Sequence, residues 1–335
     1  MSAEEIARAG KILVTGASGF LGTNIVWSLR EQGFAVRALV RRWPLGPEWT
    51  GIDGVEWVIG DVRNGKDVAR AMENITHVIH AAALTRILPR PRRQSYEVNV
   101  EGTQNVCAAA LQAGVRRLVF TSSASTLQPG TTQQPADENS PVNRVPIRAP
   151  YYDSKQKAEQ VVRAFAALGL ETIILCPGYI LGPRDMRPTT NEILRYAARW
   201  PWPAFPPGGM NIIDVREAAL AHVRALWLGN PTQRYLLAGP YHSYVELGRM
   251  VRRLMGWGSA WQLPPWTRFV GSIPLAVASG VFAAIPNGLT VASFQYGYVS
   301  YHLSGVRADH MFGLTHRPAE QTVRDTLQWF GIITR

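Results

Sequence analysis

The sequence KILVTGASGFLG, residues 11–22, decides the fold. Its β-branched first part, Lys11–Thr15, predicts a buried strand, and a helix is expected over Phe20–Gln32. The turn between them carries three glycines, Gly16, Gly19 and Gly22. Glycines allow a tight turn and a close approach of the backbone to a pyrophosphate, and a helix N-terminus offers unpaired N–H groups to phosphates. The stretch therefore predicts a dinucleotide-binding turn.

Strand and helix patterns alternate along the first half of the chain. Further strands are expected at Ala35–Val40, Val55–Ile59, His77–Ala81, Arg117–Thr121 and Glu171–Leu175. Helices are expected at Lys66–Met72, Gln94–Gln112 and Asp153–Leu168. Alternation of this kind predicts an α/β fold with a Rossmann-type doubly wound parallel sheet, whose ligands bind beyond the carboxyl ends of the strands.

The second half has a different composition. Six prolines lie between residues 181 and 209, where we expect a loop region on the substrate side. A strand followed by a helix is expected within Ile212–Leu228, and another strand at Tyr235–Ala238. We therefore expect three parts. These are a nucleotide-binding domain over 10–180 with 212–240 returning to its sheet, a smaller substrate-binding part made of 181–211 and 241–317, and a C-terminal helix over 318–331.

Charge and cysteine content exclude several classes of protein. The 335 residues include 35 Lys and Arg against 24 Asp and Glu, a net charge of +11, but no recognition helix or zinc-finger spacing. A phosphate-rich cofactor explains this charge better than a nucleic acid does. The two cysteines, Cys107 and Cys176, cannot form a disulfide framework or a Cys-rich zinc site, and they suit a reducing cytoplasm. The seven histidines lack metal-binding spacing, so no metal is expected.

Residues Met1–Gly10 have neither the basic start nor the apolar core of a secretory signal, so we expect a cytoplasmic protein. Between Phe269 and Val306 there is no charged residue. The most apolar part, 269–285, is shorter than the roughly 20 residues that a membrane span needs. Core packing, contact with a membrane surface aided by nearby arginines, and a true span stay open as explanations. Homodimerisation also stays open.

The end of the second strand bears on the choice of cofactor. An acid at this point would bind the ribose 2′-hydroxyl of NAD, but residues 36–42 read VRALVRR. Guanidinium groups bind a 2′-phosphate that a carboxylate would repel. We therefore predict NADP(H) over NAD(H), with NAD still possible, and Arg41 before Arg42 as the contact. The alternative is a solvated basic loop.

A Tyr, Lys and Ser set predicts acid–base chemistry. Tyr151 and Lys155 are four residues apart and so share one helical face, and a Ser-bearing strand end, VFTSS, precedes them. A free tyrosine has a pKa of about 10, and a nearby ammonium group favours the phenolate and lowers that value. The hydroxyl of Ser123, or else that of Ser122, can position a substrate oxygen.

Together these motifs resemble the extended short-chain dehydrogenase/reductase family, also called the NAD-dependent epimerase/dehydratase family. The resemblance covers nearly the whole chain. The segments that carry it are TGASGFLG (15–22), GDV (60–62), HAAA (80–83), NVEGT (99–103), FTSSAS (120–125) and YYDSK (151–155). Residues 188–190, 209–216 and 234–239 resemble a branch that holds dihydroflavonol 4-reductase-like proteins, hopanoid-associated sugar epimerases and 3β-hydroxysteroid dehydrogenase-like proteins.

The resemblance implies roles for individual residues. Tyr151 would give or take the proton, Lys155 would hold the ribose and tune Tyr151, and Ser123 would orient the substrate oxygen. Asn99 would be structural. The pyrophosphate turn would comprise Gly16, Ser18, Gly19, Phe20, Leu21 and Gly22. Other cofactor contacts would be Asp61 and Val62 at the adenine, Ala81, Ala82 and Ala83 at the nicotinamide ribose, and Pro177 and Gly178 near the carboxamide.

Two departures from the family pattern flank the substrate pocket: Cys176 replaces an arginine that many relatives carry, and the segment Thr85–Arg93 is unusual. They affect the substrate rather than hydride transfer. The expected activity is oxidation or reduction of a carbonyl or secondary alcohol on an apolar cyclic small molecule. Alternatives are a nucleotide-sugar epimerase or dehydratase that retains its cofactor, and an NADP-binding protein without turnover.

Overall fold

A seven-stranded sheet forms the centre of the computed structural model, which describes residues 10–43, 46, 49, 52–85, 92–143, 150–270 and 291–334. The strand order is β10-β6-β5-β4-β1-β2-β3, and every neighbouring pair is parallel. The strands are β1 (Lys11–Thr15), β2 (Ala35–Val40), β3 (Val55–Ile59), β4 (Ile75–His80), β5 (Arg117–Thr121), β6 (Thr172–Pro177) and β10 (Arg234–Leu237). The predicted doubly wound α/β fold is confirmed.

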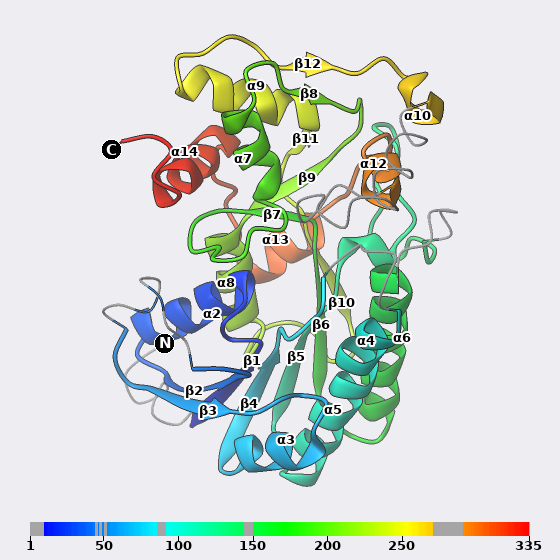
Figure 1. The fold of residues 1–335 in the computed structure, drawn as a ribbon. Coiled ribbons are helices and arrows are strands. Elements are labelled where there is room, and N and C mark those ends of the chain that lie inside the picture. The colour runs from blue at the N-terminus through cyan, green and yellow to red at the C-terminus, as the bar shows by residue number, and fades with distance from the viewer. Residues whose placement is uncertain are drawn as a thin grey trace.

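Helices cover both faces of this sheet (Figure 1). One core forms where α2 (Phe20–Glu31), α8 (Val215–Arg224) and α13 (Val306–Phe312) pack against it. The other core lies under α3 (Gly65–Met72), α5 (Gly102–Gln112) and α6 (Pro150–Ala167). Strands buried on both faces explain the nearly continuous apolar runs of the sequence.

The predicted helix over Gln94–Gln112 is interrupted. It consists of α4 (Arg92–Tyr96), a π-helical turn η2 (Glu97–Glu101) and α5. A π turn inserts an extra residue into the helical repeat and is frequent at functional sites. Here it buries Asn99 at 1% exposure against α6. Periodicity alone did not reveal this interruption.

The C-terminal part has its own small sheet at the carboxyl ends of the large one. In it β9 (Gly209–Asp214) pairs with β7 (Tyr179–Leu181), β11 (Tyr241–Ser243) and β13 (Ser300–Tyr301). A separate pair joins β8 (Ala204–Phe205) to β12 (Trp261–Gln262). The remaining helices here are α7 (Glu192–Arg199), α9 (Tyr244–Leu254), α10 (Thr267–Val270), α12 (Val291–Tyr296) and α14 (Ala319–Trp329).

The sequence predicted a loop region over 181–209, but the structure has the helix α7 within it. The flanking prolines hid an amphipathic segment that buries Leu194, Ala197 and Ala198. Within the described ranges, no helix is both long and apolar enough to cross a membrane. The stretch 269–285 lies outside the described residues from residue 271 onward.

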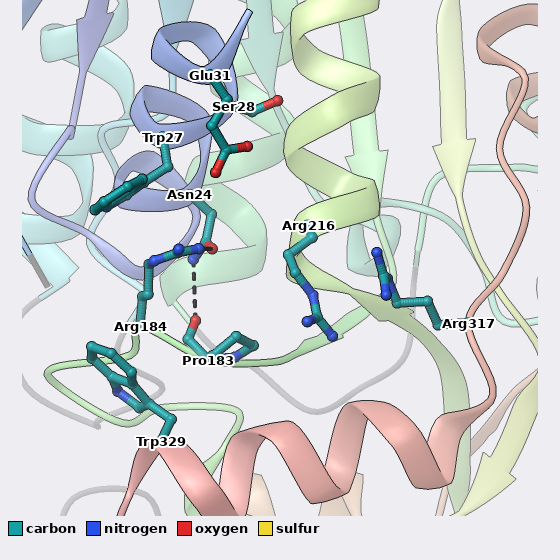
Figure 2. A pocket seen from close by; sticks show the side chains of 9 residues that line it. All are labelled: Asn24, Trp27, Ser28, Glu31, Pro183, Arg184, Arg216, Arg317 and Trp329. Atoms are coloured by element: carbon teal, nitrogen blue, oxygen red, sulfur yellow. Dashed lines mark hydrogen bonds between the residues drawn. The ribbon is translucent and has the colours of Figure 1, made fainter. Parts of the chain in front are cut away.

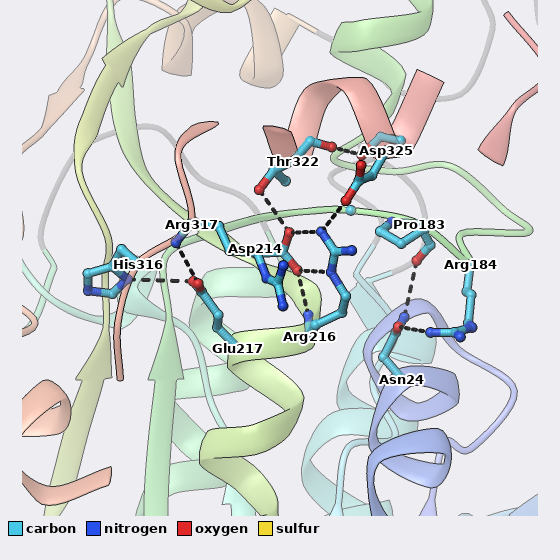
Figure 3. A network of polar contacts seen from close by, with 12 residues as sticks. Asn24, Pro183, Arg184, Asp214, Arg216, Glu217, His316, Arg317, Thr322 and Asp325 are labelled. Atoms are coloured by element: carbon cyan, nitrogen blue, oxygen red, sulfur yellow. Dashed lines mark hydrogen bonds and ion pairs between the residues drawn. The ribbon is translucent and has the colours of Figure 1, made fainter. Parts of the chain in front are cut away.

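A polar network joins the two parts of the chain (Figure 3). Asp214 ends β9 and caps α8 by accepting from the Arg216 backbone N–H at 2.8 Å. Its carboxylate also pairs with the Arg216 guanidinium at 2.6 Å and accepts from Thr322 of α14 at 2.8 Å. Arg216 reaches Asp325 of α14 at 2.7 Å. The network fixes α14 to the start of α8.

Candidate active site

The glycine turn has the shape that a dinucleotide requires. Gly16 has φ +68°, a conformation that favours glycine, and a Cβ added there would lie 2.6 Å from the Ala82 backbone. A Cβ at Gly22 would collide with the Gly16 carbonyl. The Gly19 N–H donates to that carbonyl at 2.9 Å. The backbone of the turn thus packs tightly against the end of β4 at the N-terminus of α2. Glycines in such a turn let the backbone come close to a pyrophosphate.

Other residues predicted to contact the cofactor lie close to this turn in the chain or in the sheet. Ser18, Phe20 and Leu21 lie in the turn or the first turn of α2, and Ala81, Ala82 and Ala83 follow β4 directly. The Ala81 N–H donates to the Thr15 carbonyl at 3.2 Å, so the ends of β4 and β1 are joined at this edge.

The end of β2 presents positive charge. Arg41 and Arg42 follow β2 directly and are exposed. The pKa of Asp61 lies below its ordinary value, mainly because Arg63 hydrogen-bonds it at 2.8 Å, with a smaller contribution from Arg41. Arg41 and Asp61 are therefore close to each other, where the adenosine of the cofactor is expected. Val62, the next residue after Asp61, is buried.

Tyr151 and Ser123 come together at the carboxyl end of β5. Tyr151 lies in the first turn of α6, and Ser123 precedes a short 3₁₀ turn, η3 (Ala124–Thr126). Burial raises the pKa of the Tyr151 phenol, and the Ser123 side chain lowers it by hydrogen bonding. The Ser123 hydroxyl is also 2.8 Å from the hydroxyl of Ser125. The two side chains that the sequence proposed for proton transfer and substrate orientation are thus neighbours.

Lys155 lies one turn further along α6 and is 2% exposed. Its Nζ donates to the Thr121 carbonyl at 2.6 Å and lies 4.3 Å from the centre of the Phe120 ring. Burial lowers the pKa of Lys155 to about 8, and the carboxylate of Glu159 acts in the opposite direction. The ammonium group is thus fixed at the end of β5, on the same helix as Tyr151.

Asn99 anchors this helix. Its side-chain amide donates to the Ser154 hydroxyl at 2.9 Å, and its oxygen accepts from the Leu84 N–H at 2.7 Å. The π turn therefore ties α6 to the segment that follows β4, in agreement with a structural role.

Ser122 and Ser123 point to different partners. The Ser122 hydroxyl donates to Glu159 at 2.5 Å, in a buried network that also contains Thr126 at 3.0 Å and Arg234 at 2.5 Å. Sequence reasoning missed Glu159 and Arg234. The sequence could have indicated Glu159, because it lies four residues after Lys155 and thus on the same face of the helix.

The end of β6 closes the site on the β10 side. Cys176 is buried, its thiol lies 3.8 Å from Glu159, and burial raises the pKa of this thiol. Pro177 ends β6, and the Gly178 N–H donates to the Leu237 carbonyl at 2.9 Å. A Cβ at Gly178 would lie 2.7 Å from the Asn211 carbonyl, so a side chain is excluded there.

His80, part of the HAAA motif, is a buried structural residue. One ring nitrogen lies 2.6 Å from the Thr15 hydroxyl and the other 3.0 Å from that of Thr103. Burial lowers the pKa of His80 to about 3, and that of His222 to about 4. Within the described residues, no group of three or more His, Cys, Asp or Glu side chains could hold a metal ion.

The two buried histidines predict that the folded protein loses stability in acid. Their folded-state pKa values lie below the unfolded value of about 6.5, so the unfolded chain binds more protons below that pH. Their stabilising contribution is complete above pH 6.5 and is lost as the pH falls toward 4 and then 3. Each histidine should contribute about 1.4 kcal/mol per pH unit to the slope of the unfolding free energy. Urea titrations of His222→Gln should show a shallower slope, whereas the exposed-residue control His310→Gln should match the parent.

A separate cavity of about 340 Å³ lies between α2, the start of α8 and α14 (Figure 2). The Arg184 guanidinium lies 4.5 Å from the Trp27 ring, and Asn24 donates to the Pro183 carbonyl at 3.2 Å. Arg216 of the polar network described above also lines it. None of the proposed catalytic side chains lines this cavity, and its contacts hold the segment after β7 against α2.

Sequence comparison identifies the family to which this site belongs. The profile of the family described as NAD dependent epimerase/dehydratase matches residues 12–200, which include the glycine turn, Ser123, Tyr151 and Lys155. The chain belongs to the NAD-dependent epimerase/dehydratase family. Its members are NAD(P)-dependent dehydrogenases and epimerases of the extended short-chain dehydrogenase/reductase type, so this chain is an NAD(P)-dependent oxidoreductase of that type.

Curated relatives in the epimerase/dehydratase family include two bacterial proteins. A dihydroflavonol 4-reductase-like protein of Synechocystis is 37% identical, over 74% of this chain and 73% of the relative. Sterol demethylase protein B of Methylococcus capsulatus is 33% identical, over 73% of this chain and 74% of the relative. The structure of UDP-glucose 4-epimerase from Thermotoga maritima matches with a TM-score of 0.78, covering 96% of this chain and 98% of the other. Its 17% identity shows the shared fold alone.

Proposed function

We propose that this protein is an NADP(H)-dependent oxidoreductase that acts on a carbonyl or secondary alcohol of an apolar cyclic substrate. The observation that carries the proposal is that Ser123 hydrogen-bonds Tyr151 at the carboxyl end of β5, where Lys155 of the same helix donates to the Thr121 carbonyl at 2.6 Å. Ligands bind at this edge in doubly wound sheets. The glycine-rich turn at Gly16 lies at the same edge, where it can hold the dinucleotide.

Each side chain has a defined task in this proposal. A bound NAD(P) would supply the hydride donor or acceptor. Ser123 donates a hydrogen bond to the substrate oxygen and positions it. Tyr151 protonates that oxygen during reduction and removes its proton during oxidation. The Lys155 ammonium stabilises the phenolate of Tyr151, because a nearby positive charge favours the ionised form.

A tyrosine cluster beside Tyr151 supports an apolar substrate. Tyr152, Tyr296 and Tyr301 form a buried apolar group against which Tyr151, Met210 and Val299 pack. The ring centres of Tyr151 and Tyr152 are 5.5 Å apart, and those of Tyr152 and Tyr296 are 4.6 Å apart. The partly buried side chains at this group, Tyr151, Met210 and Val299, suit contact with a flat, apolar ring. The names of the sterol and flavonol relatives point to the same substrate class.

A substrate screen tests the proposal. The purified protein is mixed with NADPH and a panel of ketosteroids and flavonoid ketones, and net loss of NADPH absorbance is recorded. UDP-glucose and UDP-galactose form the comparison set. We expect stoichiometric NADPH oxidation with at least one apolar ketone and none with the sugar nucleotides. Interconversion of the sugars without net NADPH oxidation would instead identify a nucleotide-sugar epimerase.

The preference for NADPH is tested at the end of β2. Arg41→Ala/Arg42→Ala should lower kcat/KM for NADPH by roughly 10- to 100-fold, the range expected when hydrogen bonds to a charged group are lost. The value for NADH should change by less than about 3-fold, because NADH has no 2′-phosphate. Arg116→Ala is the control, because this exposed arginine precedes β5 and so lies at the end of the sheet away from the cofactor site. A parent enzyme that prefers NADH would contradict the assignment.

A further inference from the structure

Five tryptophan side chains are exposed at the end of the molecule opposite the seven-stranded sheet. They lie next to or within β8, β12, the end of α9 and the start of α10, which gather at that end (Figure 1). Large apolar side chains exposed together mark interaction surfaces. This tryptophan face consists of Trp200 (54% exposed), Trp202 (77%), Trp257 (52%), Trp261 (62%) and Trp266 (62%).

Backbone contacts bring these residues together although they are far apart in sequence. The pairing of β8 with β12 places the Trp261 N–H 2.9 Å from the Pro203 carbonyl. The buried Arg252 guanidinium donates to the Trp200 carbonyl at 3.1 Å and lies 4.9 Å from the Trp257 ring. Trp200, Trp257 and Trp261 are thus attached to hydrogen-bonded backbone, and their exposure is a feature of the folded chain.

The same surface carries positive charge, and the two chain segments that form it contain no acidic residue. No Asp or Glu occurs in residues 193–213 or 247–308. Arg199, Arg249 and Arg268 are exposed within these segments. Arg253 is partly neutralised by Glu320 of α14, at 3.5 Å. Arg199, Arg249 and Arg268 form no ion pair with a residue that the structure describes. Exposed tryptophans next to such arginines match the interface of an anionic bilayer, where indole rings lie at the headgroup level and guanidinium groups meet lipid phosphates.

We propose that the tryptophan face docks this protein onto an anionic membrane surface. The contact is peripheral, with the indole rings in the headgroup layer. A second copy of this chain is a poorer occupant, since a symmetric dimer through this face would bring arginines against arginines. This inference is independent of the catalytic proposal, because it uses none of the residues near Tyr151.

Vesicle co-sedimentation of the full chain tests the tryptophan contribution. The vesicles are equal mixtures of phosphatidylcholine and phosphatidylglycerol, with pure phosphatidylcholine as the comparison. Trp202→Ser/Trp261→Ser should lower the partition coefficient by at least ~10-fold, because bilayer binding scales with the apolar area inserted. Trp43→Ser is the matched control, since Trp43 is 55% exposed but follows β2 in the nucleotide-binding part. It should bind like the parent.

A second pair of variants separates a specific face from the overall charge of +11. Arg199→Gln/Arg268→Gln should lower binding to the anionic vesicles by ~25-fold, at about 5-fold per basic residue near the surface. Lys66→Gln/Arg116→Gln removes the same charge from exposed sites elsewhere and should lower it by less than ~3-fold. Equal losses in both pairs would mean unspecific attraction and overturn the proposal.

Two further results keep the test decisive. Melting temperatures of all variants within a few degrees of the parent establish that they are folded. In the parent, tryptophan emission should shift to shorter wavelength on anionic vesicles, and the shift should be lost in Trp202→Ser/Trp261→Ser. A parent dimer that this variant converts to monomers, with vesicle binding unchanged, would show that the face is a protein interface.

Discussion

Replacing Tyr151 by phenylalanine should lower kcat by at least ~10²-fold, the effect of removing a general acid or base. The change deletes one hydroxyl and leaves the ring, which packs against the tyrosine cluster, in place. Affinity for the dinucleotide should stay within a few-fold of the parent, because the glycine turn and Lys155 are untouched. The measurement combines steady-state kinetics with NADPH fluorescence titration.

The neighbouring tyrosine provides a matched control for this experiment. Tyr152→Phe makes the same chemical change one position along α6, in a side chain that is 9% exposed and packs with Tyr296. Its kcat should change by only a few-fold. Lys155→Met should lower both kcat and affinity for the dinucleotide, since Lys155 is expected to hold the ribose. Near-parental turnover in Tyr151→Phe would remove Tyr151 from the reaction.

The sheet could be predicted because its signals are local. The run Lys11–Thr15 coincides with β1, and Ala35–Val40 coincides with β2. Each of these strands is a short apolar segment bounded by a turn, and their parallel order follows from the helices between them. The proposed site residues could be identified for a similar reason, since they lie at strand ends and on the first turns of helices. Their catalytic roles stay predictions.

The features that the sequence did not reveal depend on contacts between distant segments. Two strands of the C-terminal part, β8 and β12, are two residues long and carry no periodic pattern. Only their pairing across the fold makes them strands, and this pairing, together with the contacts of Arg252, brings exposed tryptophans close to one another. The π turn at Asn99 likewise depends on its contact with Ser154. The contact between Glu159 and Arg234 spans 75 residues and crosses from α6 to β10.

That contact gives the second large prediction. Glu159 is 3% exposed, and its carboxylate accepts hydrogen bonds from Ser122, Thr126 and Arg234. Glu159→Ala should lower the free energy of unfolding by roughly 3–5 kcal/mol, because it leaves a buried guanidinium without its counter-charge. Urea unfolding followed by circular dichroism measures the loss. Glu192→Gln, which breaks an exposed pair with Arg195 on α7, should cost less than about 1 kcal/mol.

The double variant Glu159→Leu/Arg234→Met separates two explanations of such a loss. If the loss in Glu159→Ala comes from the orphaned Arg234 charge, replacing both partners by apolar side chains of similar size should recover most of it. The Nε of Arg234 already lacks a hydrogen-bond partner within the described part of the chain, so this side chain gains little from its position without Glu159. A double variant as unstable as Glu159→Ala would instead assign the loss to the hydroxyls of Ser122 and Thr126.

The same carboxylate links stability to the proposed role of Lys155. Burial lowers the pKa of Lys155 to about 8, and Glu159 is the main group that opposes this shift. Glu159→Gln retains the shape of the side chain but removes the charge, so the pKa of Lys155 should fall further. Lys155 would then lose its proton at a lower pH, and the phenolate of Tyr151 would lose its stabilising charge there. We therefore expect the pH profile of kcat for alcohol oxidation in Glu159→Gln to depart from that of the parent below pH 8. An unchanged profile would show that Glu159 acts only in folding.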